Sequence, residues 1–196
     1  MSVRDERRSQ IIAAARALVA EGGLEALTIG AIEKRVPFTR GVITYHFADK
    51  DEIVGAVLES VVDEIDRGTF AEVHEADAFP ARIRAVLRSK VRGFLKHAEA
   101  RACLVSYWSR VASDERAHTV NQRLFASWRS QAAGLLGAAK KSGDARLDLD
   151  VDAVAALLVG LVVGIVVQTA FDDSDVERLV EEATAMVVAR CRPARA

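Results

Sequence analysis

Hydrogen-bonding side chains gather in one short segment of this chain, between positions 39 and 46. They comprise two hydroxyls, a guanidinium, a phenol and an imidazole, carried by Thr39, Thr44, Arg40, Tyr45 and His46. Such groups can donate hydrogen bonds to DNA phosphates or reach base edges in a groove. Ile43 and Phe47 add apolar residues at helical spacing. The segment is therefore predicted to be a short helix with one packed side and one side that contacts DNA.

A second short apolar pattern precedes this helix. Its members recur at helical spacing and are Ile29, Ile32 and Val36. Only residues 37–38, a proline and a phenylalanine, separate the two patterns, so together they predict a helix-turn-helix. Thr28 and Thr39 stand before the two apolar runs, where a hydroxyl can accept a hydrogen bond from a first-turn amide and cap the helix.

The residue types suggest separate roles at a DNA surface. We expect Arg40 to contact a guanine through O6 and N7. Thr44, Tyr45 and His46 can contact bases, a thymine methyl group or phosphates, although the two rings can instead pack under the helix. The expected phosphate anchors are Thr28, Thr39 and Lys50.

Two helices are predicted to flank this motif. The first runs from about Arg4 to Glu21, ends at Gly22-Gly23, and closes a three-helix DNA-binding domain over residues 1–48. Its early arginines, Arg4, Arg7 and Arg8, either touch phosphates or a minor groove or are solvated at a frayed end. Asp49 and Glu52 form a capping-box pattern for the next helix, which runs to about Asp66. Residues 49–78 are thus expected to be a connecting helix followed by a linker.

The remaining residues, 79–196, also carry helical periodicity, and no segment alternates as a strand does. The predicted fold class is all-α, with about nine helices. An eighth helix over Val151–Phe171 is apolar all round, and a ninth begins at a second capping box, Ser174 with Glu177. A row of small side chains on the eighth is expected at a dimer interface: Ala156, Gly160, Gly164 and Gln168.

One alternative treats residues 153–171 as a membrane anchor. The fully apolar run, Ala153 to Val167, is shorter than the ~20 residues that span a bilayer core, so a buried helix is favoured. The charged amino terminus carries no signal-peptide pattern. We expect a cytoplasmic protein without membrane contact.

Composition limits the possible functions. Of the 196 residues, 51% are hydrophobic, which is enough for a sizeable core. Net charge is −1, but residues 1–50 carry eight basic and six acidic side chains, so that part is +2 and the remainder −3. Cys103 and Cys191 lie far apart without metal-ligand spacing, which predicts buried, reduced thiols. No catalytic motif is present, and we expect no enzyme activity, no metal and no cofactor.

The chain resembles the TetR family of transcriptional regulators. The residues that carry the resemblance are Leu27-Thr28, Ile32, the run Ile43-Thr44-Tyr45-His46-Phe47, Lys50 and Ile53. Pro37 departs from the usual turn glycine, and Thr44 from the usual first of two aromatics, so the operator sequence does not carry over. The resemblance implies a homodimer, usually a repressor, on a pseudo-palindromic operator of double-stranded DNA that a small molecule releases. It also implies dimerisation through the last two helices.

The effector is expected within residues 79–196, the predicted ligand-sensing and dimerisation domain. Its bulky aromatic residues are the candidate pocket wall: Phe94, Tyr107, Trp108, Phe125 and Trp128. His97 and Gln168 are possible polar anchors, while the alternative is that the aromatics form plain core. Tyr107-Trp108 and Trp128-Arg129 are loosely similar to the choline-regulator branch of the family.

Overall fold

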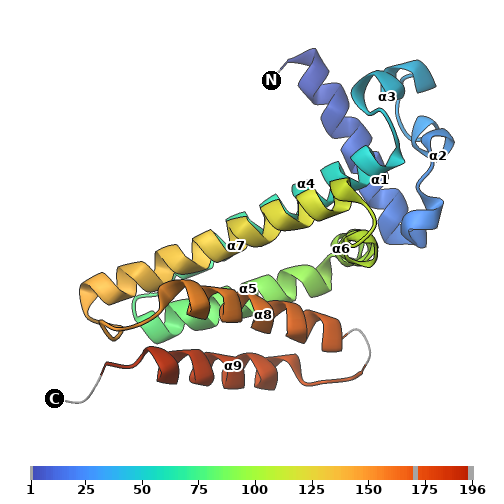
Figure 1. Cartoon of the computed structure of the whole chain (residues 1–196). Helices are drawn as coiled ribbons and strands as arrows, with labels where there is room; N and C mark the ends of the chain where they lie inside the picture. Colours follow the sequence, from blue (N-terminus) through green and yellow to red (C-terminus); the bar gives the residue numbers. More distant parts are fainter. Residues whose placement is uncertain (1, 170–171, 194–196) are drawn as a thin grey trace. The chain divides into compact units, whose positions relative to one another are not determined.

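The protein is described by a computed structural model that covers residues 2–169 and 172–193. Over those residues it has nine α-helices and no strand. Figure 1 labels the helices. The helices are α1 (Val3–Ala26), α2 (Ile29–Glu33), α3 (Arg40–His46), α4 (Lys50–Glu75), α5 (Phe79–Lys96), α6 (Ala98–Arg110), α7 (Glu115–Ser142), α8 (Val151–Gln168) and α9 (Val176–Cys191). The all-α prediction is confirmed. The expected end of the eighth helix at Phe171 lies outside the described residues.

The chain forms two compact units. The first joins Met1–Glu64 to Lys96–Val120, and the second joins Ile65–Leu95 to Asn121–Ala196. Helices α4 and α7 each contribute residues to both units. These boundaries differ from the functional ranges expected from the sequence, because α6 packs against α1 and so belongs with the amino-terminal helices.

The first unit is built on an apolar face of α1. Ile11, Ala15 and Leu18 lie on that face and are buried. At Gly22 and Gly23 the backbone leaves helical geometry, and Gly23 has a φ of 69°, a conformation that glycine adopts without a Cβ clash. The predicted break therefore stands at Gly22-Gly23, and a further helical stretch continues to Ala26.

Helix α4 is longer than the sequence pattern suggested. Its predicted end near Asp66 is wrong, because the helix continues through the expected linker to Glu75. Thr69 in this extension is buried, and its hydroxyl donates to the carbonyl oxygen of Ile65 at 2.9 Å and lies 3.2 Å from the hydroxyl of Ser89. A satisfied polar side chain of this kind fits a packed helix, so only residues 76–78 separate α4 from α5.

The second unit packs α5 against neighbouring helices through an apolar face. Pro80 lies in the first turn of α5, as predicted, and Ile83, Leu87 and Val91 are buried. Helices α8 and α9 lie side by side. The predicted Ser174 cap of α9 is wrong: the Asp175 carboxylate accepts from the Arg178 amide at 3.1 Å, because the helix begins one residue later.

Candidate nucleic-acid interface

Helices α2 and α3 are fixed to the core of the first unit by one fully buried residue each. Ile32 and Ile43 both have no exposed surface. Thr28 caps α2, and its hydroxyl oxygen accepts from the amide of Ala31 at 3.0 Å. Because Ile43 points inward, the opposite side of α3 faces outward.

The start of α3 is capped differently from the prediction. Thr39 occupies the cap position, but its side chain makes no capping hydrogen bond. Instead the carboxylate of Glu33 accepts from the amide of Arg40 at 2.8 Å. Helical spacing within α3 gives no sign of this role of Glu33, because the bond joins α2 to α3. The Thr39 hydroxyl consequently remains available for another partner.

The outward side of α3 carries most of the expected DNA-contacting side chains. Arg40, Thr44 and Tyr45 are exposed, and the Tyr45 residue is 70% exposed. Packing of the Tyr45 ring under the helix is therefore excluded. His46 is half-buried, with its ring edge-on to Tyr45 at 5.3 Å between centroids. The Thr44 hydroxyl lies 3.2 Å from the carbonyl oxygens of Arg40 and Gly41, to which it can donate, so its methyl group is the part left for a base.

Lys50 has a structural contact that the sequence did not indicate. Its ammonium donates to the carbonyl oxygen of Leu24 at 2.5 Å, which ties the start of α4 to the end of α1. The side chain is exposed, and this bond uses one of the three ammonium donors, so the others can donate to a phosphate. The predicted Asp49 cap is present, since Asp49 accepts from the Glu52 amide at 2.8 Å. That bond, followed by Arg116, lowers the pKa of Asp49.

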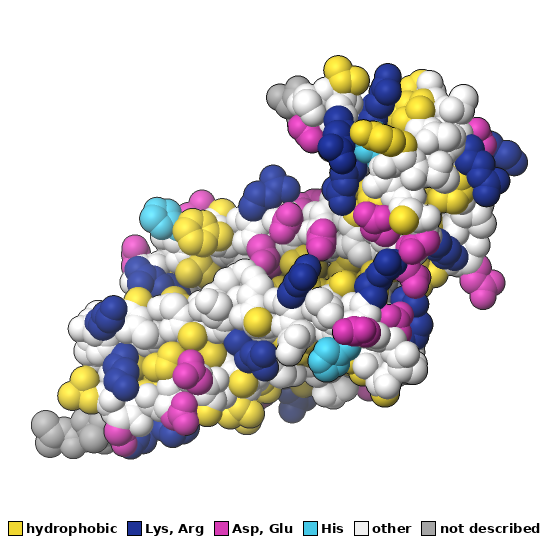
Figure 2. All heavy atoms as spheres, turned by 45° about the horizontal axis from the view of Figure 1, so that its top comes forward, with side chains coloured by type: hydrophobic (Ala, Val, Ile, Leu, Met, Phe, Trp, Pro, Cys, Tyr) yellow, Lys and Arg dark blue, Asp and Glu magenta, His cyan; other side chains and the backbone are white. Residues whose placement is uncertain are grey.

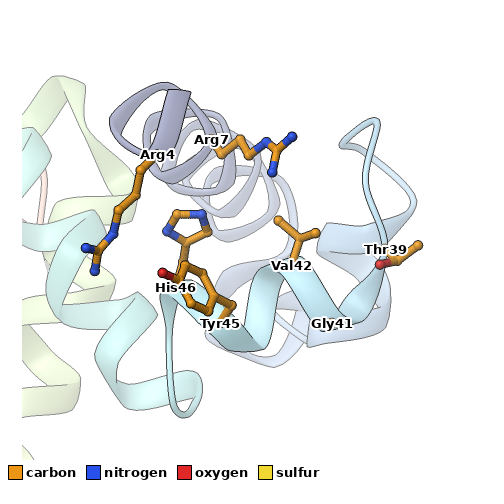
Figure 3. A pocket seen from close by; sticks show the side chains of 7 residues that line it. All are labelled: Arg4, Arg7, Thr39, Gly41, Val42, Tyr45 and His46. Carbon is orange, nitrogen blue, oxygen red and sulfur yellow. The ribbon is translucent and has the colours of Figure 1, made fainter. Parts of the chain in front are cut away.

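A hollow of 410 Å³ lies between the first turns of α1 and the outward side of α3. Figure 3 shows its lining, which comprises Arg4, Arg7, Thr39, Gly41, Val42, Tyr45 and His46. Lys and Arg side chains also gather at the helix-turn-helix end of the chain in Figure 2. The outward side of α3 thus borders a hollow with two arginines, a surface suited to a polyanion.

Comparison with known proteins identifies the family. Residues 11–57 match the bacterial regulatory proteins of the tetR family, and residues 73–183, more than half of the chain, match the tetracyclin repressor-like C-terminal domain. The chain belongs to the TetR family. The predicted helix-turn-helix regulator is confirmed at this level.

Individual TetR-family relatives are distant. The HTH-type transcriptional regulator BetI of Burkholderia thailandensis is 27% identical over 110 residues, and the matched part covers 56% of each chain, or about half of the relative's length. A putative transcriptional regulator from Saccharomonospora viridis, solved in complex with choline, has a TM-score of 0.75 at 21% identity over 93% of this chain and 96% of that one. FadR from Bacillus subtilis, solved with stearoyl-CoA, has a TM-score of 0.74 at 18% identity over 94% and 99%. At these identities the two structures show a shared fold.

The membrane alternative for residues 153–171 is not supported. Helix α8 is long and apolar enough to cross a membrane by length and composition alone, as core helices of soluble proteins also are. Matches throughout the chain are instead to TetR-family transcriptional regulators.

The five aromatic residues expected in an effector pocket fall into both units. Phe94, Phe125 and Trp128 pack together in the second unit, with the Trp128 ring 5.8 Å from Phe94 and 5.4 Å from Phe125 between centroids. Tyr107 and Trp108 belong to the first unit. The Tyr107 residue is 1% exposed and its hydroxyl donates to the Asp51 carbonyl oxygen, so it is a core residue there.

The structure also shows the surroundings of His97 and of the two cysteines. His97, expected as a pocket anchor, has its ring nitrogens 3.5 Å from Glu64 and 3.1 Å from Glu99. No group of three metal-binding side chains occurs among the residues that the structure describes. Cys103 and Cys191 are free and buried, and burial raises the pKa of Cys103 to about 12.

Proposed function

We propose that this TetR-family regulator is a cytoplasmic homodimer that binds a pseudo-palindromic operator and, as a repressor, is released from it by a small molecule. The observation that carries the proposal is the orientation of α3. Ile43 is fully buried, whereas Arg40, Thr44 and Tyr45 are exposed on the other side. A helix held in this way can enter a major groove and present three hydrogen-bonding or apolar contacts to base edges.

Within that groove the side chains have distinct proposed roles. The Arg40 guanidinium donates to O6 and N7 of a guanine, a bidentate pairing that suits its planar fork of donors. Thr44 offers its methyl group to a thymine, because its hydroxyl proton is engaged by the helix backbone. Tyr45 and His46 contact bases or the adjacent backbone. Thr28, Thr39 and Lys50 remain the proposed phosphate contacts.

The dimer is proposed to form through α8 and α9. Only 39% of the residues of α8 are buried within the chain, although the helix is apolar all round. The exposed part is a large apolar face that needs a partner. Ala156, Gly160 and Gln168 are exposed and Gly164 is half-buried, while Leu157 and Met186 add exposed apolar surface of 67% and 63%. Small side chains allow close helix approach, which supports a four-helix bundle with two helices from each copy.

The effector is proposed to bind in the second unit near the aromatic cluster of Phe94, Phe125 and Trp128. One helical turn away on α5 and α7 lie Lys90 and Gln131, which both contact Asp66. Of these polar residues Lys90 is buried, Asp66 is half-buried and Gln131 is exposed. Apolar walls beside a few polar groups are typical of small-molecule sites. Choline and stearoyl-CoA, bound by two proteins of the same fold, differ chemically, so we propose only a molecule with an apolar body and a polar group.

A selection experiment tests the function. The parent protein is incubated with a random duplex DNA library, and bound molecules are amplified and sequenced. We expect enrichment of one sequence with two inverted half-sites about one helical turn, or a multiple of it, apart. Enrichment of no sequence would contradict the proposal, and a single half-site would contradict the dimeric arrangement.

A second experiment tests the effector. Compounds are screened for release of the selected duplex and for a change in tryptophan emission of a Trp108→Phe variant, in which Trp128 is the remaining reporter. By linkage, a compound that weakens DNA binding must itself bind the DNA complex more weakly by the same factor. A releasing compound that leaves Trp128 emission unchanged would place its site elsewhere.

A further inference from the structure

We propose that the hollow between the first turns of α1 and the outward side of α3 is a second DNA contact. It holds the sugar-phosphate backbone through Arg4, Arg7 and Thr39. The proposal rests on the function proposed above and adds a site that α3 alone does not supply. It assigns phosphate binding to arginines that the helix-turn-helix pattern does not contain.

The first turn of α1 is capped by side-chain hydrogen bonds. Ser2 caps the helix, and its hydroxyl oxygen accepts from the Asp5 amide at 3.2 Å. The Asp5 carboxylate accepts in return from the Ser2 amide at 3.1 Å. This reciprocal capping box satisfies two otherwise orphaned amides. Arg4 and Arg7 are therefore held on a formed helix, which lowers the entropy lost when they bind.

The two arginines stand on either side of His46 in Figure 3. The Arg4 guanidinium carbon lies 5.8 Å from the Tyr45 ring centroid, so the exposed ring supports that side chain. Neither Arg4 nor Arg7 forms an ion pair with a residue that the structure describes. Other arginines of the first unit do pair with carboxylates: Arg16, Arg35, Arg110 and Arg116.

The opposite wall also suits a phosphate. Thr39 lines the hollow, and its side chain makes no capping hydrogen bond, so its hydroxyl can donate to an anionic oxygen. Gly41 lines the hollow without a side chain. A Cβ at this position would lie near only the Thr39 hydroxyl oxygen, at 3.8 Å. Two guanidinium groups and a hydroxyl that line one hollow offer several hydrogen-bond donors to the phosphates of a DNA backbone.

Arg8 provides a matched control. It follows Arg7 directly and carries the same charge, but it does not line the hollow. Its guanidinium carbon lies 5.0 Å from the Phe47 ring centroid. An Arg8→Ala change therefore removes the same charge from the same helix but leaves every residue that lines the hollow in place.

The test measures affinity for the duplex selected by the parent protein and for a random-sequence duplex, each at several salt concentrations. Arg7→Ala is expected to weaken binding to both duplexes by roughly tenfold or more, the value of a hydrogen bond to a charged group. It should also flatten the plot of log affinity against log salt by about 0.9 for each phosphate that the variant no longer neutralises. Arg4→Ala should act in the same direction, and Arg7→Lys should keep most of the slope. Arg8→Ala should change both quantities less.

The outcomes separate the two proposals. If the parent enriches a sequence but Arg7→Ala and Arg4→Ala keep its affinity and salt slope, the hollow is not a phosphate site and the function stands. Equal losses in Arg8→Ala and Arg7→Ala would also overturn the site, because helix charge alone would explain them. If the parent enriches no sequence, the proposed function itself fails. Circular dichroism of each variant verifies that the helices are intact.

Discussion

The hydroxyl of Tyr107 on α6 donates a hydrogen bond to the carbonyl oxygen of Asp51 on α4, 2.9 Å away. Asp51 lies in the first turn of the helix that follows α3 along the chain. Gly55, one turn later, allows this approach, because a Cβ at that position would lie 2.9 Å from the Tyr107 hydroxyl oxygen. Burial, followed by the nearby Asp51 carboxylate, raises the pKa of Tyr107 to about 12, so the phenol stays protonated and donates at neutral pH.

A double-mutant cycle tests this contact. Tyr107→Phe should lower the free energy of unfolding by about 1 kcal/mol, because it removes a hydrogen bond without opening a large cavity. Gly55→Ala should cost more in the parent, where its methyl group meets the hydroxyl, and less in the Tyr107→Phe background. Urea unfolding measures all four proteins. Additive effects would show that the two residues are not in contact.

The ion cluster of the first unit predicts acid sensitivity. Arg16 on α1 lies 3.0 Å from Glu64 on α4 and 3.3 Å from Glu99 on α6. Burial alone would raise the pKa of Glu99, but hydrogen bonds from its own amide, His97 and Arg16 outweigh it, and the net pKa lies below 4.5. A carboxyl with a depressed pKa stabilises the fold above its unfolded pKa, and this contribution is lost as the pH falls below about 4.5.

We therefore expect Glu99→Gln to lower stability by about 1 to 3 kcal/mol at pH 7 and to flatten the decline below pH 4.5. Unfolding free energies measured by urea titration between neutral and acid pH provide the comparison. A variant curve parallel to that of the parent throughout would show that Glu99 is not a source of the acid dependence.

The dimer interface is tested at Gly160. A Cβ at Gly160 would have no neighbouring atom of the same subunit within 4 Å, so Gly160→Leu should leave the subunit folded. The larger side chain should instead disrupt the proposed bundle. Gly134→Leu is the matched control, because Gly134 is exposed on α7 and equally open. Sedimentation velocity should show a monomer for the first variant and a dimer for the control. A native-like Gly160→Leu dimer, or a monomeric parent at micromolar concentration, would refute the interface.

Lys50 is expected to have two separable effects. Lys50→Ala should reduce stability slightly, because the variant cannot form the bond to the Leu24 carbonyl oxygen. It should also weaken binding to all duplexes alike and flatten the salt dependence. Thermal unfolding and the salt slope distinguish the two. An unchanged salt slope with lower stability would leave Lys50 a structural residue only.

The sequence predicted local features better than contacts between helices. The Thr28 cap, the break at Gly22-Gly23 and the place of Pro80 in the first turn of α5 depend on neighbouring residues, and all three were predicted. The Glu33 bond to Arg40 and the length of α4 were not, because they depend on packing between separate helices. Tyr107 was expected to line a pocket because it is a bulky aromatic residue. Its residue type does not reveal that its hydroxyl donates to a carbonyl oxygen of α4.

The candidate DNA site followed the same rule. Helical spacing placed Ile43 inside and Arg40, Thr44 and Tyr45 outside, as the structure has them. The hollow beside them was not predicted, because its lining residues come from α1 and α3, which are separated along the chain by α2.

Binding of Arg40→Ala to the selected duplex is the most direct test of the central claim that α3 recognises the operator. The measurement compares parent and variant on the duplex and on all single-base variants of one half-site. We predict a loss of about 1 to 3 kcal/mol on the selected sequence and relaxed preference at one base position per half-site, with other positions unchanged. An Arg40→Ala protein that binds the selected duplex as tightly and as selectively as the parent would contradict the account.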